Sequence, residues 1–150
     1  MILYNWTGLG LREDPAGSGK FGASRGKRTH AGYDRLCKPG QVIKAPMAGK
    51  MMRSFPYAND KFYTGVSIWA DDYMVKMWYF SPFEYLIINR VARGQEIGIA
   101  QNISDKYGGG MKAHVHLGLW SLNPTTLLNP EDYLEPAEDE RLVKLQNGGH

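Results

Sequence analysis

Short apolar runs separated by glycine or charged residues make up most of the chain. The clearest pair covers residues 64–70 and 73–80, which are rich in Val, Ile, Trp and Tyr. Asp71 and Asp72 stand between these two runs and fit a two-residue turn. This pattern predicts a β-hairpin.

Further strand candidates lie on both sides of this hairpin. Gly49 interrupts one of them and indicates a bend or a bulge, and a glycine run at 108–110 precedes the last. The candidates are residues 41–44, 47–55, 84–91, 96–101 and 114–121. Many short strands with glycine turns favour an all-β fold, either an open sandwich or a barrel-like core.

The two ends differ from this pattern. Residues 1–25 are glycine-rich with few apolar runs, which indicates an ordered but irregular leader rather than a helix or strand. Residues 135–150 hold a proline followed by acidic residues, then a lysine and a glycine, which together fit a short helix. Residues 26–134 are left as the predicted functional domain.

Composition narrows the class of protein. The chain has 150 residues, of which 43% are hydrophobic, enough for one core in one domain. A net charge of +3 suits an acidic polymer but falls short of a nucleic-acid signature, so we expect no nucleic-acid partner. No apolar run is long enough for a signal peptide or a membrane helix, so we expect synthesis in the cytoplasm and no membrane partner. Cys37, the single cysteine, excludes an intrachain disulfide and is expected to be a small buried side chain.

Histidines supply the candidate chemistry, and the chain has only four. His114 and His116 are two residues apart in a predicted strand, so both imidazoles face the same side. One could bind a metal while the other acts beside it. The alternative is a pair of polar residues on a solvated strand face.

His30 and Asp34 could complete such a site, with Gly32 between them allowing a tight backbone path. A pair with this spacing is common on protein surfaces, so a structural role is the alternative. Two imidazoles, one carboxylate and an open fourth position match a catalytic zinc site better than a closed structural one.

Four ordered motifs carry a family resemblance. Residues 28–34, 39–49, 94–98 and 114–116 resemble the lysostaphin/LytM-type metallopeptidases in order and spacing, over roughly residues 20–134. Residues 34–37 and 75–82 are most similar to the leukocyte-derived chemotaxin branch and to phage-encoded domains. The resemblance implies a grooved fold of the duplicated hybrid motif type. It also implies that His30, Asp34 and His116 bind Zn²⁺, that His114 is catalytic, and that the substrate is a peptide bond in peptidoglycan cross-bridges or stems.

The sequence departs from this family at one position. Active members carry a second catalytic histidine in a Tyr-x-His motif, whereas the matching residues here are Tyr79, Phe80 and Ser81. Tyr79 or Ser81 could donate a hydrogen bond to an oxyanion, but neither is a base at neutral pH. Loss of a general acid–base group costs about 10²–10⁴ in rate. The chemotaxin branch, as the resemblance goes, keeps zinc without this histidine and acts by binding.

Two leading hypotheses therefore follow from the sequence, and a domain that holds no metal is a third possibility. The first is a zinc-dependent peptidoglycan peptidase, phage-encoded and associated with other virion proteins or released to the cell wall. The second is a catalytically impaired, zinc-holding domain that binds the wall or serves as a structural module of a virion tail. Arg28, two residues before His30, could hold a substrate carboxylate or form a surface salt bridge.

Overall fold

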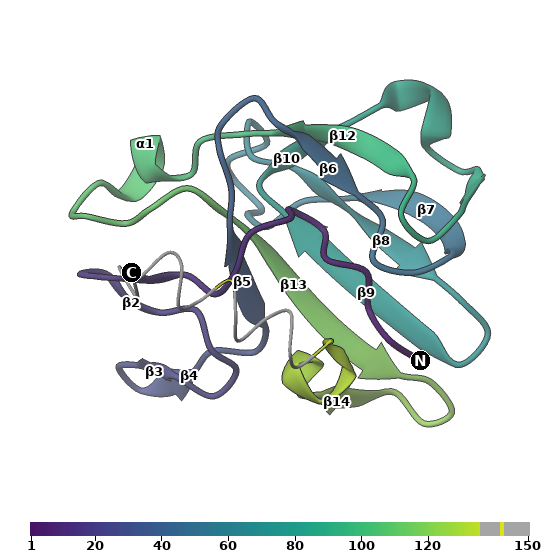
Figure 1. Ribbon diagram of the computed structural model, residues 1–150, viewed down its shortest axis with the longest axis horizontal. Coiled ribbons are helices and arrows are strands. Elements are labelled where there is room, and N and C mark those ends of the chain that lie inside the picture. The colour runs from purple at the N-terminus through teal and green to yellow at the C-terminus, as the bar shows by residue number, and fades with distance from the viewer. Residues whose placement is uncertain (136–141, 143–150) are drawn as a thin grey trace.

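The computed structural model describes residues 1–135 and residue 142 (Figure 1). The predicted helix in the C-terminal tail therefore lies almost wholly outside the described residues. The helical segments are η1 (Glu84–Leu86), α1 (Ser104–Tyr107) and η2 (Pro130–Tyr133). The strands are β1 (Glu13–Asp14), β2 (Gly17–Ser18), β3 (Ser24–Arg25), β4 (Arg28–Thr29), β5 (Tyr33–Leu36), β6 (Val42–Lys44), β7 (Gly49–Ser54), β8 (Gly65–Trp69), β9 (Tyr73–Trp78), β10 (Phe80–Pro82), β11 (Arg90–Val91), β12 (Glu96–Ala100), β13 (His114–Ser121) and β14 (Thr126–Leu128).

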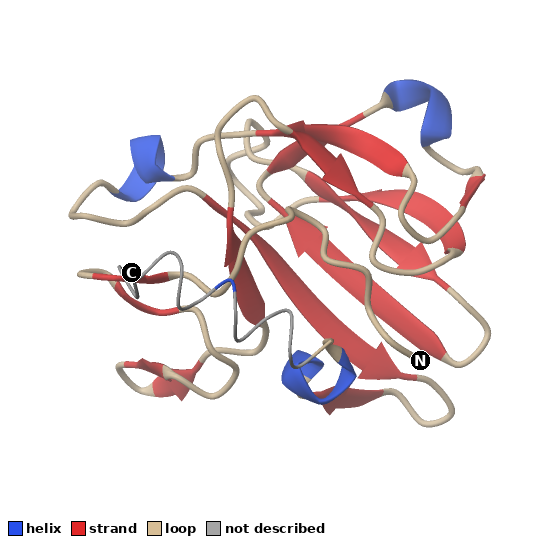
Figure 2. Cartoon of the chain, viewed as in Figure 1, coloured by secondary structure: helices blue, strands red, loops and turns tan. Residues whose placement is uncertain are grey.

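Two antiparallel sheets form the body of the protein. The larger has the order β11-β7-β8-β9-β13-β14, and β5 also pairs with β13. The smaller has the order β10-β12-β6. Neither sheet closes into a barrel, and strands dominate the described chain (Figure 2). The all-β prediction is confirmed, in its open form.

Alternation along β13 separates the core from the functional face. Val115, Leu117 and Leu119 are fully buried on one side of this strand. His114 and His116 alternate with them and therefore face the other side. Trp6, near the N-terminus, is also fully buried and donates a hydrogen bond from Nε1 to the Val115 carbonyl at 3.1 Å. The N-terminal segment therefore contacts β13, although it is more than 100 residues away in the sequence.

The predicted hairpin is confirmed. β8 and β9 pair antiparallel from Gly65 opposite Trp78 to Trp69 opposite Met74, with the predicted turn between them. The predicted strand at 114–121 is also confirmed as β13. The hairpin is marked by its turn residues and β13 by alternating apolar residues, and both signals lie in the local sequence.

Two local predictions are wrong. Residues 84–91 form the 3-10 helix η1 followed by the short strand β11, because Leu86 turns back on Phe83 through a backbone hydrogen bond of 3.0 Å. Gly49 does not bulge; it starts β7, opposite Val91. A Cβ there would lie 2.5 Å from the Trp69 carbonyl oxygen, so glycine permits a close approach of backbones.

The leader contains two short hairpins, β1–β2 and β3–β4, although the sequence indicated no strands there. Figure 1 shows β2, β3 and β4 beside β5, at the edge away from β7 and β8. Backbone hydrogen bonds join the leader to β5, from Arg12 N to Asp34 O and from Asp34 N to Gly19 O. The boundary at residue 25 stays a prediction, but the leader contributes directly to the position of Asp34.

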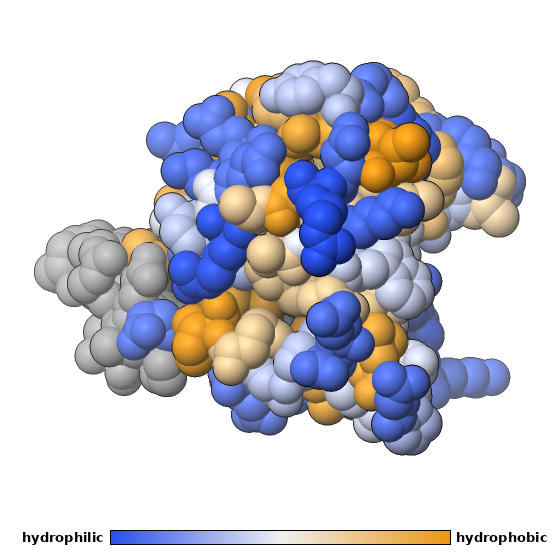
Figure 3. Space-filling model, turned by 90° about the vertical axis from the view of Figure 1, so that its right-hand side faces the viewer, coloured by the Kyte–Doolittle hydropathy of each residue, from blue (hydrophilic) through white to orange (hydrophobic). Residues whose placement is uncertain are grey.

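The surface remote from these hairpins is mixed in character. Figure 3 shows polar residues interrupted by separate small apolar groups on the face opposite the hairpins β1–β2 and β3–β4. Among the described residues, no helix has the length and apolar character needed to cross a membrane.

Candidate metal centre

The register of β13 with its two neighbours creates the centre. His116 lies directly opposite Asp34 of β5 on one side and Trp78 of β9 on the other. Cross-strand partners face the same side of a sheet, so the three side chains converge. Asp34 Oδ1 lies 2.9 Å from His116 Nδ1, and the Trp78 and His116 rings stack at 5.2 Å between centroids.

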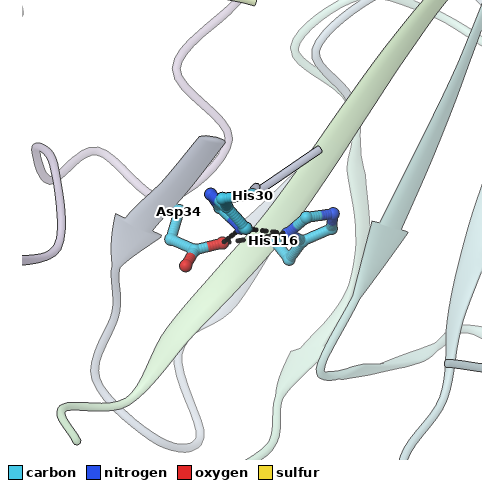
Figure 4. A group of neighbouring side chains, drawn as sticks. All are labelled: His30, Asp34 and His116. Carbon is cyan, nitrogen blue, oxygen red and sulfur yellow. Dashed lines mark hydrogen bonds and ion pairs between the residues drawn. The ribbon is translucent and has the colours of Figure 1, made fainter. Parts of the chain in front are cut away.

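His30 completes the group from the loop before β5 (Figure 4). Its Nε2 lies 3.1 Å from His116 Nδ1 and 3.3 Å from Asp34 Oδ1. Atoms bound about 2.0–2.1 Å from a tetrahedral zinc ion are separated by about 3.3 Å from one another. The three donor atoms therefore have the spacing of three corners of such a site, and they offer the nitrogen and oxygen donors that zinc accepts.

The tautomer of His30 agrees with a metal-binding role. Its Nδ1 lies 3.0 Å from the Lys20 carbonyl oxygen, which can only accept a hydrogen bond. The proton of a neutral His30 ring is therefore on Nδ1, and Nε2 directs a lone pair at Asp34 and His116. An outer hydrogen bond of this kind commonly orients a metal-binding histidine.

Gly32 allows the two halves of the centre to meet. A Cβ at this position would lie 2.4 Å from His116 Cε1 and 2.5 Å from the Leu117 carbonyl oxygen. The sequence suggested a tight backbone path at Gly32. The structure shows that the constraint is close packing against the His116 ring.

Arg12 holds the other oxygen of Asp34. Its guanidinium is 2% exposed and donates from Nε to Asp34 Oδ2 at 3.2 Å. It also donates from Nη1 to Asp14 Oδ1 at 2.8 Å and to the Gly17 carbonyl at 3.3 Å. Because Arg12 binds Oδ2, Oδ1 remains directed at the two histidines.

His114 lies beside the centre without joining it. Its Nδ1 is 2.8 Å from the Lys112 carbonyl oxygen, which places the proton of the neutral ring on Nδ1. Its Nε2 therefore carries the lone pair and lies 3.6 Å from Asp34 Oδ2. This ring is buried, at 3% exposure, and is suited to exchange a proton at Nε2.

The electrostatics favour an ionised Asp34 and a neutral His114. Burial raises the pKa of Asp34, but its interactions with His114, His116 and His30 outweigh burial and hold that pKa well below its usual range. Burial lowers the pKa of His114, although Asp34 opposes the shift. A carboxylate and a neutral imidazole are the forms that metal binding and proton acceptance require.

A cavity of about 440 Å³ opens above these residues. Tyr79 lies on one wall with its ring edge-on to His114 at 5.3 Å, and its hydroxyl is 3.2 Å from that of Tyr57. The Tyr57 hydroxyl also bonds that of Tyr107. Tyr79 has a φ of 87°, an uncommon conformation for a residue other than glycine, at the point where β9 gives way to β10. Burial raises the pKa of Tyr79 to about 12, so its hydroxyl stays protonated at neutral pH.

The remaining predicted site residues take different places. Arg28 lines the cavity from β4. Ser81 does not line it: this residue is exposed in β10, between the buried Phe80 and Pro82. The structure thus brings Tyr79, rather than Ser81, to the wall beside His114.

Sequence reasoning missed several residues of the centre. Arg12 and Asp14 lie in the leader, where no motif indicated a role. Tyr57, in the loop between β7 and β8, and Tyr107, the last residue of α1, are distant in sequence and meet at the cavity. The buried Arg12–Asp14 pair carried one weak signal, a basic and an acidic residue close together in an otherwise glycine-rich segment.

Comparisons with known proteins identify relatives. No family model matches the chain. Leukocyte cell-derived chemotaxin-2 of Bos taurus is 30% identical over 116 residues, which are 76% of this chain and 75% of the relative. The same protein of Mus musculus is 31% identical over 118 residues, covering 77% and 76% of the two chains.

Solved structures share the fold. Lysostaphin from Staphylococcus simulans matches with a TM-score of 0.63 at 16% identity, over 92% of this chain and 56% of its own. The chain thus spans little more than half the length of that peptidase. The catalytic domain of the prophage-encoded protein EnpA from Enterococcus faecalis matches with a TM-score of 0.59 at 17% identity, over 88% and 96%. Together with the chemotaxin relatives, these matches show that the chain belongs to the lysostaphin/LytM-type metallopeptidase family.

Proposed function

We propose that this protein is a zinc-dependent peptidoglycan peptidase that hydrolyses peptide bonds in cell-wall cross-bridges or stems. The observation that carries the proposal is the convergence of His30 Nε2, Asp34 Oδ1 and His116 Nδ1 within 2.9–3.3 Å of one another. An open cavity lies above them, with the lone pair of His114 at its side.

The chemistry divides between the metal and the chain. A bound zinc ion lowers the pKa of a coordinated water and polarises a carbonyl. His114 accepts a proton at Nε2, because its Nδ1 is committed to the Lys112 carbonyl, and can return that proton to a leaving amine. Arg12 holds Asp34 Oδ2, so that Oδ1 stays directed at His30 and His116.

Tyr79 supplies a hydrogen-bond donor rather than a base. Its pKa of about 12 keeps the hydroxyl protonated, and its ring lies against His114 at the cavity wall. A protonated hydroxyl there can donate to a developing oxyanion. Tyr57 lies within hydrogen-bond distance of this hydroxyl and helps to fix its position.

A role in phage infection is the biological setting that we propose. The prophage-encoded EnpA shares the fold, and the sequence resembles phage-encoded domains of the family. As part of a virion, the domain would reach the cell wall from outside. Released at lysis, it would reach the wall from inside.

A digestion assay tests the enzymatic proposal. Purified protein is loaded with zinc and incubated with cell walls of several cross-link types, and new amino termini are measured. Release should stop with chelator and return with added zinc. His114→Ala should slow release at least about 100-fold while zinc content, measured by elemental analysis, stays stoichiometric. No chelator-sensitive release from any wall would refute the enzymatic proposal.

A second candidate has its own observation. The chain has no histidine between His30 and His114, and Ser81, the residue in the matching motif position, is exposed and does not line the cavity. A zinc-holding domain that binds the wall, or a structural module of a virion, fits this loss. Sedimentation of the zinc-loaded protein with walls, without release of amino termini, would support it. Protein without stoichiometric zinc after metal-replete purification would contradict both candidates.

A further inference from the structure

Two arginines lie opposite each other on the β3–β4 hairpin. Arg25 of β3 pairs with Arg28 of β4 across a turn formed by Gly26 and Lys27. Both side chains line the cavity that contains the histidines. Like charges directly opposite each other in a strand pair destabilise it, so this pairing calls for a compensating anion.

The two guanidinium groups differ in how they are held. Arg25 donates to the Ser18 carbonyl at 2.7 Å and to the Ser24 carbonyl at 3.0 Å, so its direction is fixed by backbone. Within the described part of the chain, Arg28 makes no hydrogen bond or ion pair. One guanidinium is therefore positioned in advance, and the other is free to close on a ligand.

The charge of the cavity lining also favours an anionic ligand. Its lining contains three arginines and one carboxylate, Asp34. Arg12 already forms ion pairs with Asp34 and Asp14, and neither Arg25 nor Arg28 forms an ion pair with a carboxylate among the described residues. A divalent cation at the centre would increase the positive potential further. An anionic ligand group is thus favoured at the hairpin side of the cavity.

We propose that Arg25 and Arg28 together bind a carboxylate of the peptide whose backbone lies at the metal centre. This inference rests on the proposed function only in taking a peptide as the ligand. The planar guanidinium fork matches a carboxylate bidentately, which a lysine cannot reproduce. The chemical class selected is a peptide with a free carboxylate near the bond at the metal, either a C-terminus or an acidic side chain.

Binding of defined peptides tests this site without reference to hydrolysis. The probe is a peptidoglycan stem pentapeptide, measured by titration calorimetry with His114→Ala protein loaded with zinc, so that cleavage cannot interfere. One arm compares the free C-terminal carboxylate with its amide. The other compares the free α-carboxylate of the γ-linked glutamate with its amide. Amidation at one of the two positions should weaken binding about 10- to 100-fold.

Arginine variants assign the effect to the hairpin. In the same His114→Ala background, Arg28→Ala should weaken binding of the carboxylate peptide about 10- to 100-fold. Its affinity should then equal that of the amide peptide. Arg28→Lys should recover only part of the loss, because the charge returns without the fork. Lys27→Ala is the matched control, since this exposed residue lies in the same turn and does not line the cavity. It should bind like the parent.

The outcomes separate this inference from the proposed function. Equal binding of acid and amide forms, equal losses in Arg28→Ala and Lys27→Ala, or no binding of any form would overturn the carboxylate site. Wall digestion by the wild-type protein could still succeed in each of those cases. Conversely, discrimination between acid and amide that depends on Arg28, without any wall digestion, would support the site while the peptidase proposal fails.

Discussion

Replacement of Arg12 by methionine should destabilise the protein far more than removal of an ordinary surface charge. The guanidinium is 2% exposed and holds two carboxylates, those of Asp34 and Asp14, whose side chains are 3% and 0% exposed. Methionine fills a similar volume without charge. Both acids would then be left buried without their cation.

The magnitude follows from that burial. Removing one partner of a buried ion pair costs about 3–5 kcal/mol of folding free energy, because an uncompensated charge remains. Three backbone or side-chain donors still reach Asp14 and Asp34, from Ala16, Lys112 and His116, so the lower half of this range is expected. In a domain of this size, 3 kcal/mol corresponds to a fall in Tm of roughly 6–12 °C.

Thermal unfolding followed by circular dichroism, with and without zinc, provides the measurement. The fall in Tm should be largest with chelator and smaller with zinc, since a bound dication replaces part of the charge lost beside Asp34. Arg53→Met is the control, because its ion pair with Glu84 joins side chains that are 30% and 76% exposed. Such surface pairs contribute about 0–1 kcal/mol. If the two variants lose equal amounts, or Arg12→Met unfolds within about 2 °C of the wild type, the buried-pair argument is wrong.

Four further outcomes test other parts of the structure. His116→Ala should abolish stoichiometric zinc binding, whereas His114→Ala should leave it largely intact; equal loss by elemental analysis would contradict the assignment of donors. Gly32→Ala should weaken zinc affinity in a chelator competition at unchanged charge, because its Cβ would meet the His116 ring at 2.4 Å. Burial raises the pKa of Cys37 from 9.0 to about 12, so native protein at pH 8.5 should resist iodoacetamide until it is unfolded. Since the folded state keeps this proton longer, the free energy of unfolding should fall as pH rises from about 9 to 12, and Cys37→Ala should reduce that fall.

Local sequence signals located the strands that carry the site. β13 shows strict alternation of Val115, Leu117 and Leu119 with the histidines, and the β8–β9 hairpin has a recognisable turn. Such patterns depend on neighbours in the chain, which the sequence displays. The run at 84–91 misled because its apolar residues are continuous rather than alternating, so periodicity could not separate a strand from the turn of η1.

Contacts between segments that are distant in the sequence could be predicted only in part. The meeting of His30 and Asp34 with His116 was anticipated from the residue types and the family resemblance, and the register of β5 on β13 now gives its physical cause. The participation of Arg12 could not be anticipated, because it depends on how the leader folds against β5. A single arginine in a glycine-rich segment has no periodicity or motif to mark it.

The cavity wall is lined by Tyr79 and not by Ser81, which shows a further limit of prediction from the sequence. Alignment of a Tyr-x-His motif assumes that the strand continues, so that the third residue faces the site as the first does. Here the positive φ of Tyr79 interrupts the strand between β9 and β10 and places Ser81 on the exposed side. Backbone conformation at one residue therefore decided which side chain reaches the cavity.

That single change also bears on how much activity the centre can support. A hydroxyl with a pKa of about 12 donates a hydrogen bond but does not accept a proton at neutral pH, so Tyr79 replaces only part of what a histidine supplies. Every proton transfer at this centre then depends on His114. Among the described residues that line the cavity, its Nε2 carries the only imidazole lone pair that is not directed at the proposed metal. Removal of a general acid–base group slows catalysis by about 10²–10⁴ without abolishing what metal and oxyanion donor contribute. The peptidase proposal therefore predicts slow turnover, whereas a domain that only binds the wall has no turnover. Long incubations of the protein with cell walls, with and without chelator, distinguish the two.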